Sequence, residues 1–476
     1  MNPDASSGSG ALPPAVLPRS RKIAFGIGGF AENFFHNALN IMATPFLNIG
    51  FGVSPALVSL AMTIPRVWDA MTDPVMGAIS DNFRSRFGRR RPFVFVGGLL
   101  TSFCFAALWW IPSGLGQTGA FWAFLVGLML YYTAFTVFVV PYLALGFEMT
   151  PDYNERTRVM SYRSLFATVA GFAMNWLYWL TQRDIFDGIV EGMRWVGIGC
   201  GIVLACATMV PALFVKEVHV PKPEELPGHD KGLGLISSLK GTLSTKPFLL
   251  VIAACVSVII GVLSIMQVGM YLNIFYVASG DQKLASTIQG IAGSCYQVTA
   301  LLTVPIVAWL GVRLGKRRAL MGILSLGIIG SLSSWFTFDP ARPYLQIASL
   351  FFSAPAITGL WILAPAMIAD VCDYDDLRSG VRREGMFGAA YGWFTKVGGA
   401  LALLISGFLL VRTGFDVKLE AAQAPATIMA MRALNAFVPA IFFSAAIAAI
   451  WKYPITEQMA GDIRRKLEGQ NVSGTA

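Results

Sequence analysis

Long apolar segments alternate with short polar ones along nearly the whole chain. Each apolar segment is long enough for the roughly 20 helical residues that a bilayer requires. They begin near Ile23, Pro55, Pro92, Thr118, Val159, Ile189, Pro247, Ser286, Ala319, Tyr344, Phe387 and Thr427. The chain of 476 residues is 55% hydrophobic and only 13% charged, which is too apolar for a soluble protein of this length. The pattern predicts an all-α integral membrane protein with about twelve transmembrane helices.

The basic residues predict how the chain is oriented in the membrane. Five arginines follow the second apolar segment between residues 84 and 91, two follow the fourth, and five lysines lie between residues 216 and 246. A net charge of +9 is compatible with binding nucleic acid, but these runs are short and lie between apolar segments. Under the positive-inside rule they place both termini in the cytoplasm. We therefore expect a multi-pass protein of the inner, cytoplasmic membrane and no nucleic-acid partner.

An internal repeat divides the chain into two halves. The segment Arg86-Phe-Gly-Arg-Arg-Arg91 is echoed by Arg313-Leu-Gly-Lys-Arg-Arg318, at an offset of 227 residues. Residues 216–246 are polar and rich in proline and glycine, as expected of a linker. We predict two pseudo-symmetric six-helix bundles over residues 22–215 and 247–454. A disordered cytoplasmic tail over residues 1–21 and a cytoplasmic tail over residues 455–476 are expected to flank them.

Three charged residues stand out within the second apolar segment. Arg66, Asp69 and Asp73 are three and four residues apart, so a helix places them along one stripe. An ionisable residue at bilayer depth costs about 2.5 to 3.5 kcal/mol on insertion scales. Three on one face indicate a polar cavity inside a helical bundle, of the kind that carries an ion or a proton.

Several motifs resemble those of one transporter family. The segment Gly77-Ala-Ile-Ser-Asp81 with the following arginines resembles the signature loop of the major facilitator superfamily. The segments Trp68-Asp-Ala-Met-Thr-Asp-Pro-Val-Met-Gly77, Pro141-Tyr-Leu-Ala-Leu-Gly146 and Lys396-Val-Gly-Gly399 resemble the glycoside-pentoside-hexuronide cation symporters, a family that includes melibiose permease. The resemblance implies the major facilitator fold and secondary active transport by alternating access.

The resemblance also implies a cation site on the second span. Its ligands map onto Asp69 and Asp73, and Thr72 and Thr136 could add hydroxyl oxygens. An acidic residue of the melibiose carrier is replaced here by Val139, which weakens a Na⁺ cage more than a proton site, because a proton needs one carboxylate and no coordination shell. We therefore favour H⁺ and keep Na⁺ at Asp69 and Asp73 as the alternative; no other metal and no cofactor are expected.

Two further basic residues are assigned to coupling. Lys396 lies deep in the eleventh span and resembles a buried family lysine that faces the carboxylates from the other half. A buried ammonium needs a counter-ion, so Asp69 and Asp73 are its expected partners. Arg66 is assigned to coupling as well. The alternative to a cation site is that Arg66 simply pairs with Asp69 and that the Asp-Pro pair shapes a helix bend.

The substrate site follows from the same resemblance. Arg163 and Trp361 match family positions that contact sugar, and Asn33 occupies the place of a sugar-binding aspartate. The roles of Glu32 and His36 stay open at this point. Hydrogen bonds and ion pairs from Asp81, Arg86, Arg89, Glu148 and Asp152 are expected to hold a cytoplasmic gate closed.

The predicted function is cation-coupled symport of a sugar or glycoside by a monomer in the lipid bilayer. One alternative is a cation-coupled symporter of a lysolipid or another amphiphile, since related eukaryotic carriers share the aspartate pair. A second is a membrane receptor or scaffold that does not transport, which leaves the buried charges without a use. An enzyme is not expected, because no nucleophile-base set or metal-ligand cluster appears.

Overall fold

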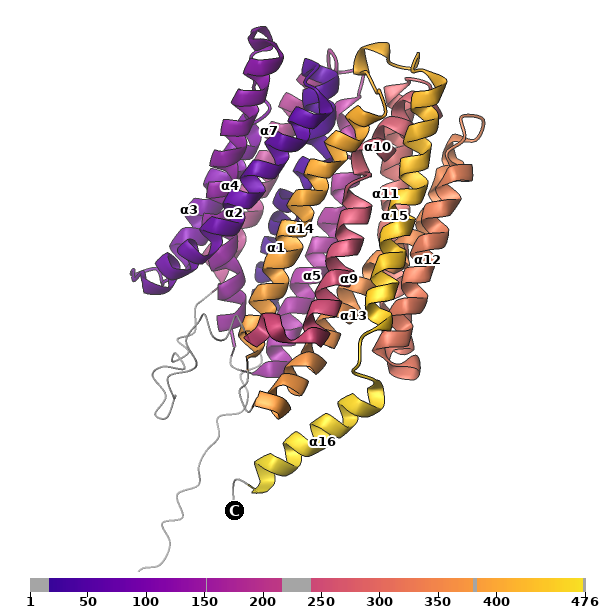
Figure 1. The fold of residues 1–476 in the computed structure, drawn as a ribbon. Helices are drawn as coiled ribbons and strands as arrows, with labels where there is room; N and C mark the ends of the chain where they lie inside the picture. Colours follow the sequence, from indigo (N-terminus) through magenta and orange to yellow (C-terminus); the bar gives the residue numbers. More distant parts are fainter. Residues whose placement is uncertain (1–16, 151, 216–240, 380–382, 474–476) are drawn as a thin grey trace, which may run out of the picture.

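The computed structural model describes residues 17–150, 152–215, 241–379 and 383–473. Residues 1–16 of the predicted disordered tail and most of the predicted linker over residues 216–246 lie outside them. The tail prediction over residues 1–21 is wrong at its end, because α1 already begins at Arg19. The described part of the chain is helical (Figure 1). The first half contains α1 (Arg19–Thr44), η1 (Pro45–Gly50), α2 (Pro55–Asn82), α3 (Arg91–Ala107), η2 (Ser113–Leu115), α4 (Gly116–Glu148), α5 (Tyr153–Asn175), α6 (Leu177–Thr181) and α7 (Ile189–Phe214).

The second half has the same up-and-down order of long helices. It contains α9 (Lys246–Leu263), α10 (Met266–Tyr271), η4 (Leu272–Val277), α11 (Gln282–Leu314), α12 (Lys316–Thr337), η5 (Pro343–Gln346), α13 (Ile347–Ser379), α14 (Glu384–Arg412), η6 (Val417–Leu419) and α15 (Pro425–Trp451). A last helix, α16 (Glu457–Ser473), occupies the segment that we predicted only as a polar tail. We call the end of the bundle that carries the α2–α3 loop the basic end, and the other the opposite end.

The long helices begin within a few residues of the predicted positions. Polar residues cap several of them. Ser54 Oγ accepts the amide hydrogen of Leu57 at the start of α2, with Pro55 in the first helical position. Asp281 caps α11 in the same way, through the amides of residues 283 and 284. Helix starts are thus determined locally, by side chains adjacent in the sequence.

The internal repeat predicted from the basic motifs is present in the backbone as well. Helix α1 continues into the π-helical segment η1 from residue 45, and α10 continues into the π-helical segment η4 from residue 272, which is 227 positions later. Helices α2 and α11 start at residues 55 and 282, at the same offset. No feature of the sequence indicated the π-helices, which are rare elements found mostly at functional sites.

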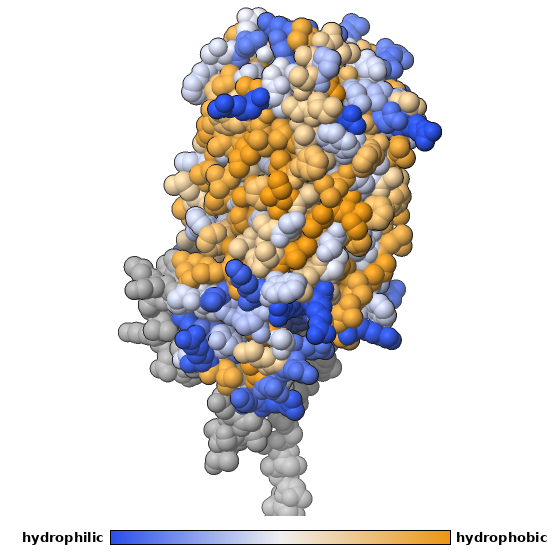
Figure 2. Space-filling model, turned by 45° about the vertical axis from the view of Figure 1, so that its right-hand side comes forward, coloured by the Kyte–Doolittle hydropathy of each residue, from blue (hydrophilic) through white to orange (hydrophobic). Residues whose placement is uncertain are grey.

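A broad apolar belt separates two polar ends of the molecule (Figure 2). Eight helical stretches in the described chain are long and apolar enough to cross a membrane by length and composition. Helices α1, α2 and α5 are not among them, although they run through the same bundle (Figure 1). These three carry the charged residues Glu32, Asp69 and Arg163, and they build the site described next.

Two hydrophobic clusters form the interior. One lies wholly in the second half, between residues 248 and 455. The other is built mainly from residues 17–215, but it also takes in residues of α10, η4 and α14, among them Tyr271, Phe275 and Leu403. Helix α2 packs along α14, and α5 packs against α11. The two halves therefore share a hydrophobic cluster, to which α10 and η4 contribute at the opposite end.

Candidate cation and substrate site

Helix α2 is weakened where its carboxylates lie. Pro65 and Pro74 are inside the helix, and the missing N–H of Pro74 leaves the carbonyl oxygen of Ala70 without its helical donor. Thr72 Oγ donates within this segment, 3.1 Å from the carbonyl oxygen of Trp68 and 3.2 Å from that of Asp69. The side chain of Thr72 thus hydrogen-bonds to the helical turn that precedes Pro74.

Lys396 of α14 lies against both carboxylates of α2. Its Nζ atom is 3.2 Å from Oδ2 of Asp69 and also donates to Oδ2 of Asp73. Thr136 of α4 donates to Oδ1 of Asp69 at 2.8 Å, and its hydroxyl is 3.4 Å from that of Thr72. Oδ1 of Asp73 is buried and has no hydrogen-bond partner among the described residues. All of the residues predicted for the cation site therefore converge, together with one residue of the other half.

Arg66 has a different partner from the one considered for it. Its guanidinium group donates to Oδ1 of Asn40 on α1 at 2.8 Å, and within the described chain it forms no ion pair with Asp69. The alternative in which Arg66 neutralises Asp69 is therefore wrong. Asp69 is neutralised across the bundle by Lys396, while Arg66 links α2 to α1 one helical turn away.

Arg163 is held by Glu32, whose role the sequence had left open. Nε and Nη2 of Arg163 on α5 donate to the two carboxylate oxygens of Glu32 on α1, at 2.8 and 2.6 Å. This bidentate geometry is strong and directional. Asn33, the next residue, is half-buried, and its carbonyl oxygen accepts a hydrogen bond from Asn37. Arg163, which we predicted to bind substrate directly, is thus already paired with the carboxylate of Glu32.

Trp361 and His36 do not join this pair. Trp361 on α13 is 49% exposed and makes no polar contact with Arg163 or Asn33 in the described chain. The imidazole of His36 lies 6.3 Å from the ring of Phe135, at a tilt of 42°. The structure therefore brings together only part of the predicted substrate site.

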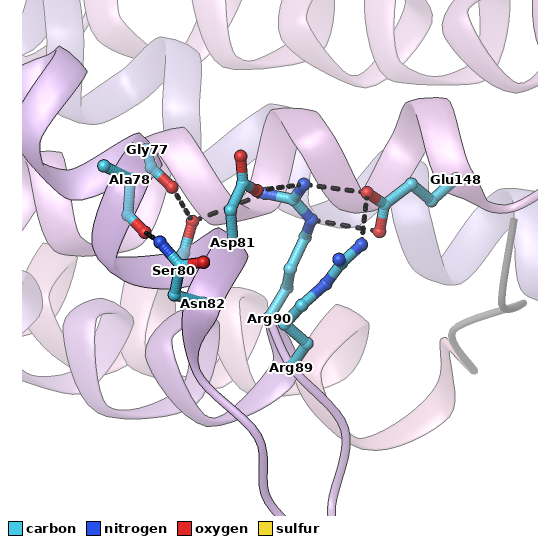
Figure 3. Close-up of polar contacts among 8 residues, drawn as sticks. All are labelled: Gly77, Ala78, Ser80, Asp81, Asn82, Arg89, Arg90 and Glu148. Atoms are coloured by element: carbon cyan, nitrogen blue, oxygen red, sulfur yellow. Dashed lines mark hydrogen bonds and ion pairs between the residues drawn. The ribbon is translucent and has the colours of Figure 1, made fainter. Parts of the chain in front are cut away.

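The basic end carries an ion-pair cluster centred on Arg90 (Figure 3). Arg90 donates to Oδ1 of Asp81 at 2.7 Å and to both oxygens of Glu148, and Arg89 also donates to Glu148 at 2.8 Å. Burial alone would lower the pKa of Arg90, but its hydrogen bonds and the charges of its two carboxylate partners raise it above its ordinary value. The cluster joins α2, the α2–α3 loop and α4, all in one half.

The gate prediction needs two corrections. Arg86 stacks over the ring of Phe87 at 4.7 Å and is not among the described ion pairs of this cluster. Asp152 caps α5 through the amide of Glu155 at 2.7 Å. Arg90, the central residue, was not predicted; its place within a run of three arginines gave no signal that distinguished it.

Polar contacts between the halves are found at the opposite end. Gln267 of α10 donates to Ser59 of α2 at 3.1 Å, Trp176 donates to Ser294 of α11 at 3.0 Å, and Tyr271 donates to Asn48. Lys283 and Asp184 form an exposed ion pair there. Gly407 of α14 lies so close to α2 that an added Cβ atom would be 2.3 Å from Oγ of Ser59. The halves are closely joined at this end.

A cavity of about 380 Å³ lies next to these contacts. It is bordered by α1 on one side and by α10, α11, α12, α13 and α15 on the other. Its polar side chains include Asn40, Gln267, Gln289, Ser334 and Asn435. None of these residues stands out in the sequence, because each is an uncharged polar residue of a common type.

With this geometry in place, comparison with known proteins identifies the family. A family model described as "MFS/sugar transport protein" matches residues 24–457. The chain belongs to this family. Members of the glycoside-pentoside-hexuronide cation symporter family make up this group, so the resemblance seen in the motifs is confirmed, and the chain is a cation symporter of the family rather than an enzyme. It is a multi-pass integral membrane protein.

Full-length relatives of this symporter family have different substrates in their names. The isoprimeverose transporter of Lactiplantibacillus pentosus is 23% identical over 99% of this chain and 98% of its own. The mouse sphingosine-1-phosphate transporter MFSD2B is 26% identical over 88% of this chain and 85% of its own. A solved bacterial homolog of the human lysosomal transporter Spinster, in an inward-facing conformation, superposes with a TM-score of 0.68 at 13% identity, covering 92% and 98% of the two chains. This last likeness confirms the all-α major facilitator fold.

Proposed function

We propose that this symporter couples the entry of a proton to the entry of a sugar or glycoside by alternating access. The observation that carries the proposal is the position of Lys396 against Asp69 and Asp73. The ammonium and the two carboxylates come from different halves, so any change in the charge of the carboxylates changes the free energy that holds the halves together. The basic end then faces the cytoplasm of an inner membrane, with the protein acting as a monomer.

The coupling mechanism follows from competition for the carboxylates. A proton that binds at Asp73 removes the charge that attracts Lys396, and Oδ1 of Asp73 is a buried acceptor without a partner in the described chain. The weakened attraction allows one half to rotate relative to the other. Because binding free energies are reciprocal, substrate that favours the rotated state must also favour proton binding.

A proton suits this site better than Na⁺. Two of the four carboxylate oxygens already face Lys396, and Oδ1 of Asp69 accepts the hydroxyl hydrogen of Thr136. Na⁺ needs several oxygen ligands at once, whereas a proton needs one. Val139, buried on α4, supplies no oxygen. Na⁺ at Asp69 and Asp73, with Thr72 and Thr136, is the alternative that the experiment below distinguishes.

A sugar or glycoside substrate is favoured by the family and by the polar groups of the bundle. The family model and the isoprimeverose transporter support it. The pair of Arg163 and Glu32 offers donors and acceptors of the kind that bind paired hydroxyl groups. The named relative MFSD2B supports a lysolipid as the second candidate. Asn33 and Trp361 remain proposed substrate contacts, with Arg163 acting through its pair with Glu32.

The decisive experiment is uptake by purified protein in liposomes. A panel of neutral glycosides, hexoses, pentosides, uronides and one lysolipid is tested under a proton gradient and, separately, under a Na⁺ gradient. Accumulation of a sugar under the proton gradient alone is expected. Accumulation that requires a Na⁺ gradient would show that Na⁺, not H⁺, is the coupling ion. Accumulation of the lysolipid alone would show that the substrate is an amphiphile and not a sugar.

A further inference from the structure

The cavity at the opposite end is separate from the carboxylates and from the pair of Arg163 and Glu32. It extends from Asn40 on α1 to Asn435 on α15, and among its described lining residues there is no Asp, Glu, Lys, Arg or His. Amides and hydroxyls share the lining with apolar side chains such as Met270 and Phe338. This chemistry suits an uncharged ligand, because a charge buried here would find no ion-pair partner.

One amide in the cavity has a hydrogen-bonding group to spare. Gln267 is only 5% exposed and donates through Nε2 to Ser59, while its Oε1 atom is buried and has no partner among the described residues. Gln289 lines the same cavity. A buried carbonyl oxygen without a donor is costly, so its position next to a cavity indicates a ligand that brings a hydroxyl or amide hydrogen.

The backbone around Gln267 is interrupted. Helix α9 ends at Leu263, and α10 starts at Met266, which places Gln267 in the first turn of a new helix. Substrate sites of secondary transporters are typically formed by such discontinuous helices. Gln267 also contacts the other half through Ser59, and the cavity residue Asn40 accepts a hydrogen bond from Arg66. The cavity is therefore connected to Arg66 of α2 through Asn40.

We infer that this cavity binds an uncharged, hydroxyl-bearing solute, with Oε1 of Gln267 accepting a hydroxyl hydrogen and the amide of Gln289 forming a second hydrogen bond. The inference rests on the proposed function and narrows its substrate class. Uronides and phosphorylated lipids are disfavoured, because their charges would be buried without a partner. A neutral glycoside can donate a hydroxyl hydrogen to Oε1 of Gln267 and pack its apolar ring face against the apolar lining.

Calorimetric titration of the full chain in lipid nanodiscs tests this inference. The probes are uncharged methyl and phenyl glycosides, a glucuronide and a lysophosphatidate. We expect the uncharged glycosides to bind most tightly, and Gln267→Leu and Gln289→Leu each to weaken them by about tenfold, as the loss of one hydrogen bond predicts. Gln182→Leu, outside the cavity, is the matched control and should bind like the parent protein.

The two hypotheses fail in different ways. Thermal unfolding first checks that both leucine variants are folded. If these variants bind neutral glycosides with the parent affinity, while a gradient drives uptake of the same glycosides, the cavity assignment is overturned and the symport proposal stands. Tighter binding of the glucuronide or lysophosphatidate also overturns the assignment. If titration shows glycoside binding that both variants weaken, but no gradient drives uptake, the assignment stands and the symport proposal fails.

Discussion

The ammonium group of Lys396 lies 3.2 Å from the Oδ2 atom of Asp69, although 327 positions separate the two residues in the chain. The contact spans the boundary between the halves, since α14 belongs to one and α2 to the other. Asp69 is buried, whereas the side chain of Lys396 is 38% exposed. The ammonium group of Lys396 can therefore become hydrated when the contact breaks, whereas the carboxylate of Asp69 stays buried. This suits a contact that must break in each transport cycle.

Replacing either carboxylate of α2 should uncouple transport. Asp69→Asn and Asp73→Asn keep the shape of the side chain but cannot take up a proton. We expect gradient-driven accumulation to fall by about 10- to 100-fold, the range of typical coupling free energies, while exchange of substrate down its own gradient persists. Uptake into liposomes measures both, with the exposed loop variant Asp187→Asn as control. Full accumulation in both α2 variants would refute the cation-site proposal.

Lys396→Met should destabilise the protein through the carboxylates it leaves behind. The partly exposed lysine limits the cost to about 2 kcal/mol, less than for a fully buried pair. In an Asp69→Asn, Asp73→Asn background the same change should cost about 1 kcal/mol less, because no carboxylate then lacks its partner. Thermal unfolding of the parent protein, Lys396→Met, the double asparagine variant and the triple variant gives the coupling free energy between Lys396 and the two carboxylates. Lys418→Met, at an exposed position, is the control, and equal costs in the two backgrounds would contradict the pairing.

Glu32 should matter for stability as much as Arg163. Glu32→Gln leaves a half-buried guanidinium without its bidentate partner, and we expect a loss of about 2 kcal/mol, moderated by the partial exposure of the pair. The charge swap Glu32→Arg with Arg163→Glu should recover part of that loss. Thermal unfolding and substrate titration report on both variants. If the charge swap is no more stable than Glu32→Gln, the ion pair is not the source of the lost stability.

A side chain at Gly407 should force the halves apart at the opposite end. In Gly407→Val the Cβ atom would lie 2.5 Å from the carbonyl oxygen of Pro55, and backbone cannot yield as a flexible side chain can. We expect the spacing between spin labels at Asp184→Cys and Lys283→Cys, in a background without native cysteines, to lengthen in electron paramagnetic resonance. Gly322→Val is the matched control, because nothing lies within 4 Å of its Cβ position. The same lengthening in the control would point to a general loss of packing.

The exposed ion pair of Asp184 and Lys283 should respond to acid. The hydrogen bond from Lys283, and then its charge, lower the pKa of Asp184 below its ordinary value. The contribution of this carboxylate to closure is therefore present at neutral pH and is lost as the pH falls through the lowered pKa. Spin labels on neighbouring loop positions should move apart on acidification. Asp184→Asn should remove that acid response, and high salt should weaken the pair at all pH values.

The positions of the helices, and the charged residues that are costly to bury in them, could be predicted from the sequence. Helix starts came within a few residues because apolar length and capping residues are local properties of the chain. Asp69, Asp73 and Lys396 were identifiable because a charge in an apolar segment is costly wherever the segment packs. The repeat at an offset of 227 residues could also be predicted, because one basic motif occurs twice in the sequence.

Which side chains contact one another could not be predicted, because it depends on how the helices pack in three dimensions. Arg163 finds Glu32 across 131 positions, Arg66 finds Asn40 rather than Asp69, and Arg90 rather than Arg86 holds the basic end. These choices depend on the rotation of each helix and its neighbours, which local periodicity does not specify. The cavity beside Gln267 is of the same kind. Its walls come from helices of both halves and from the break between α9 and α10, and they exist only once the two halves have packed together.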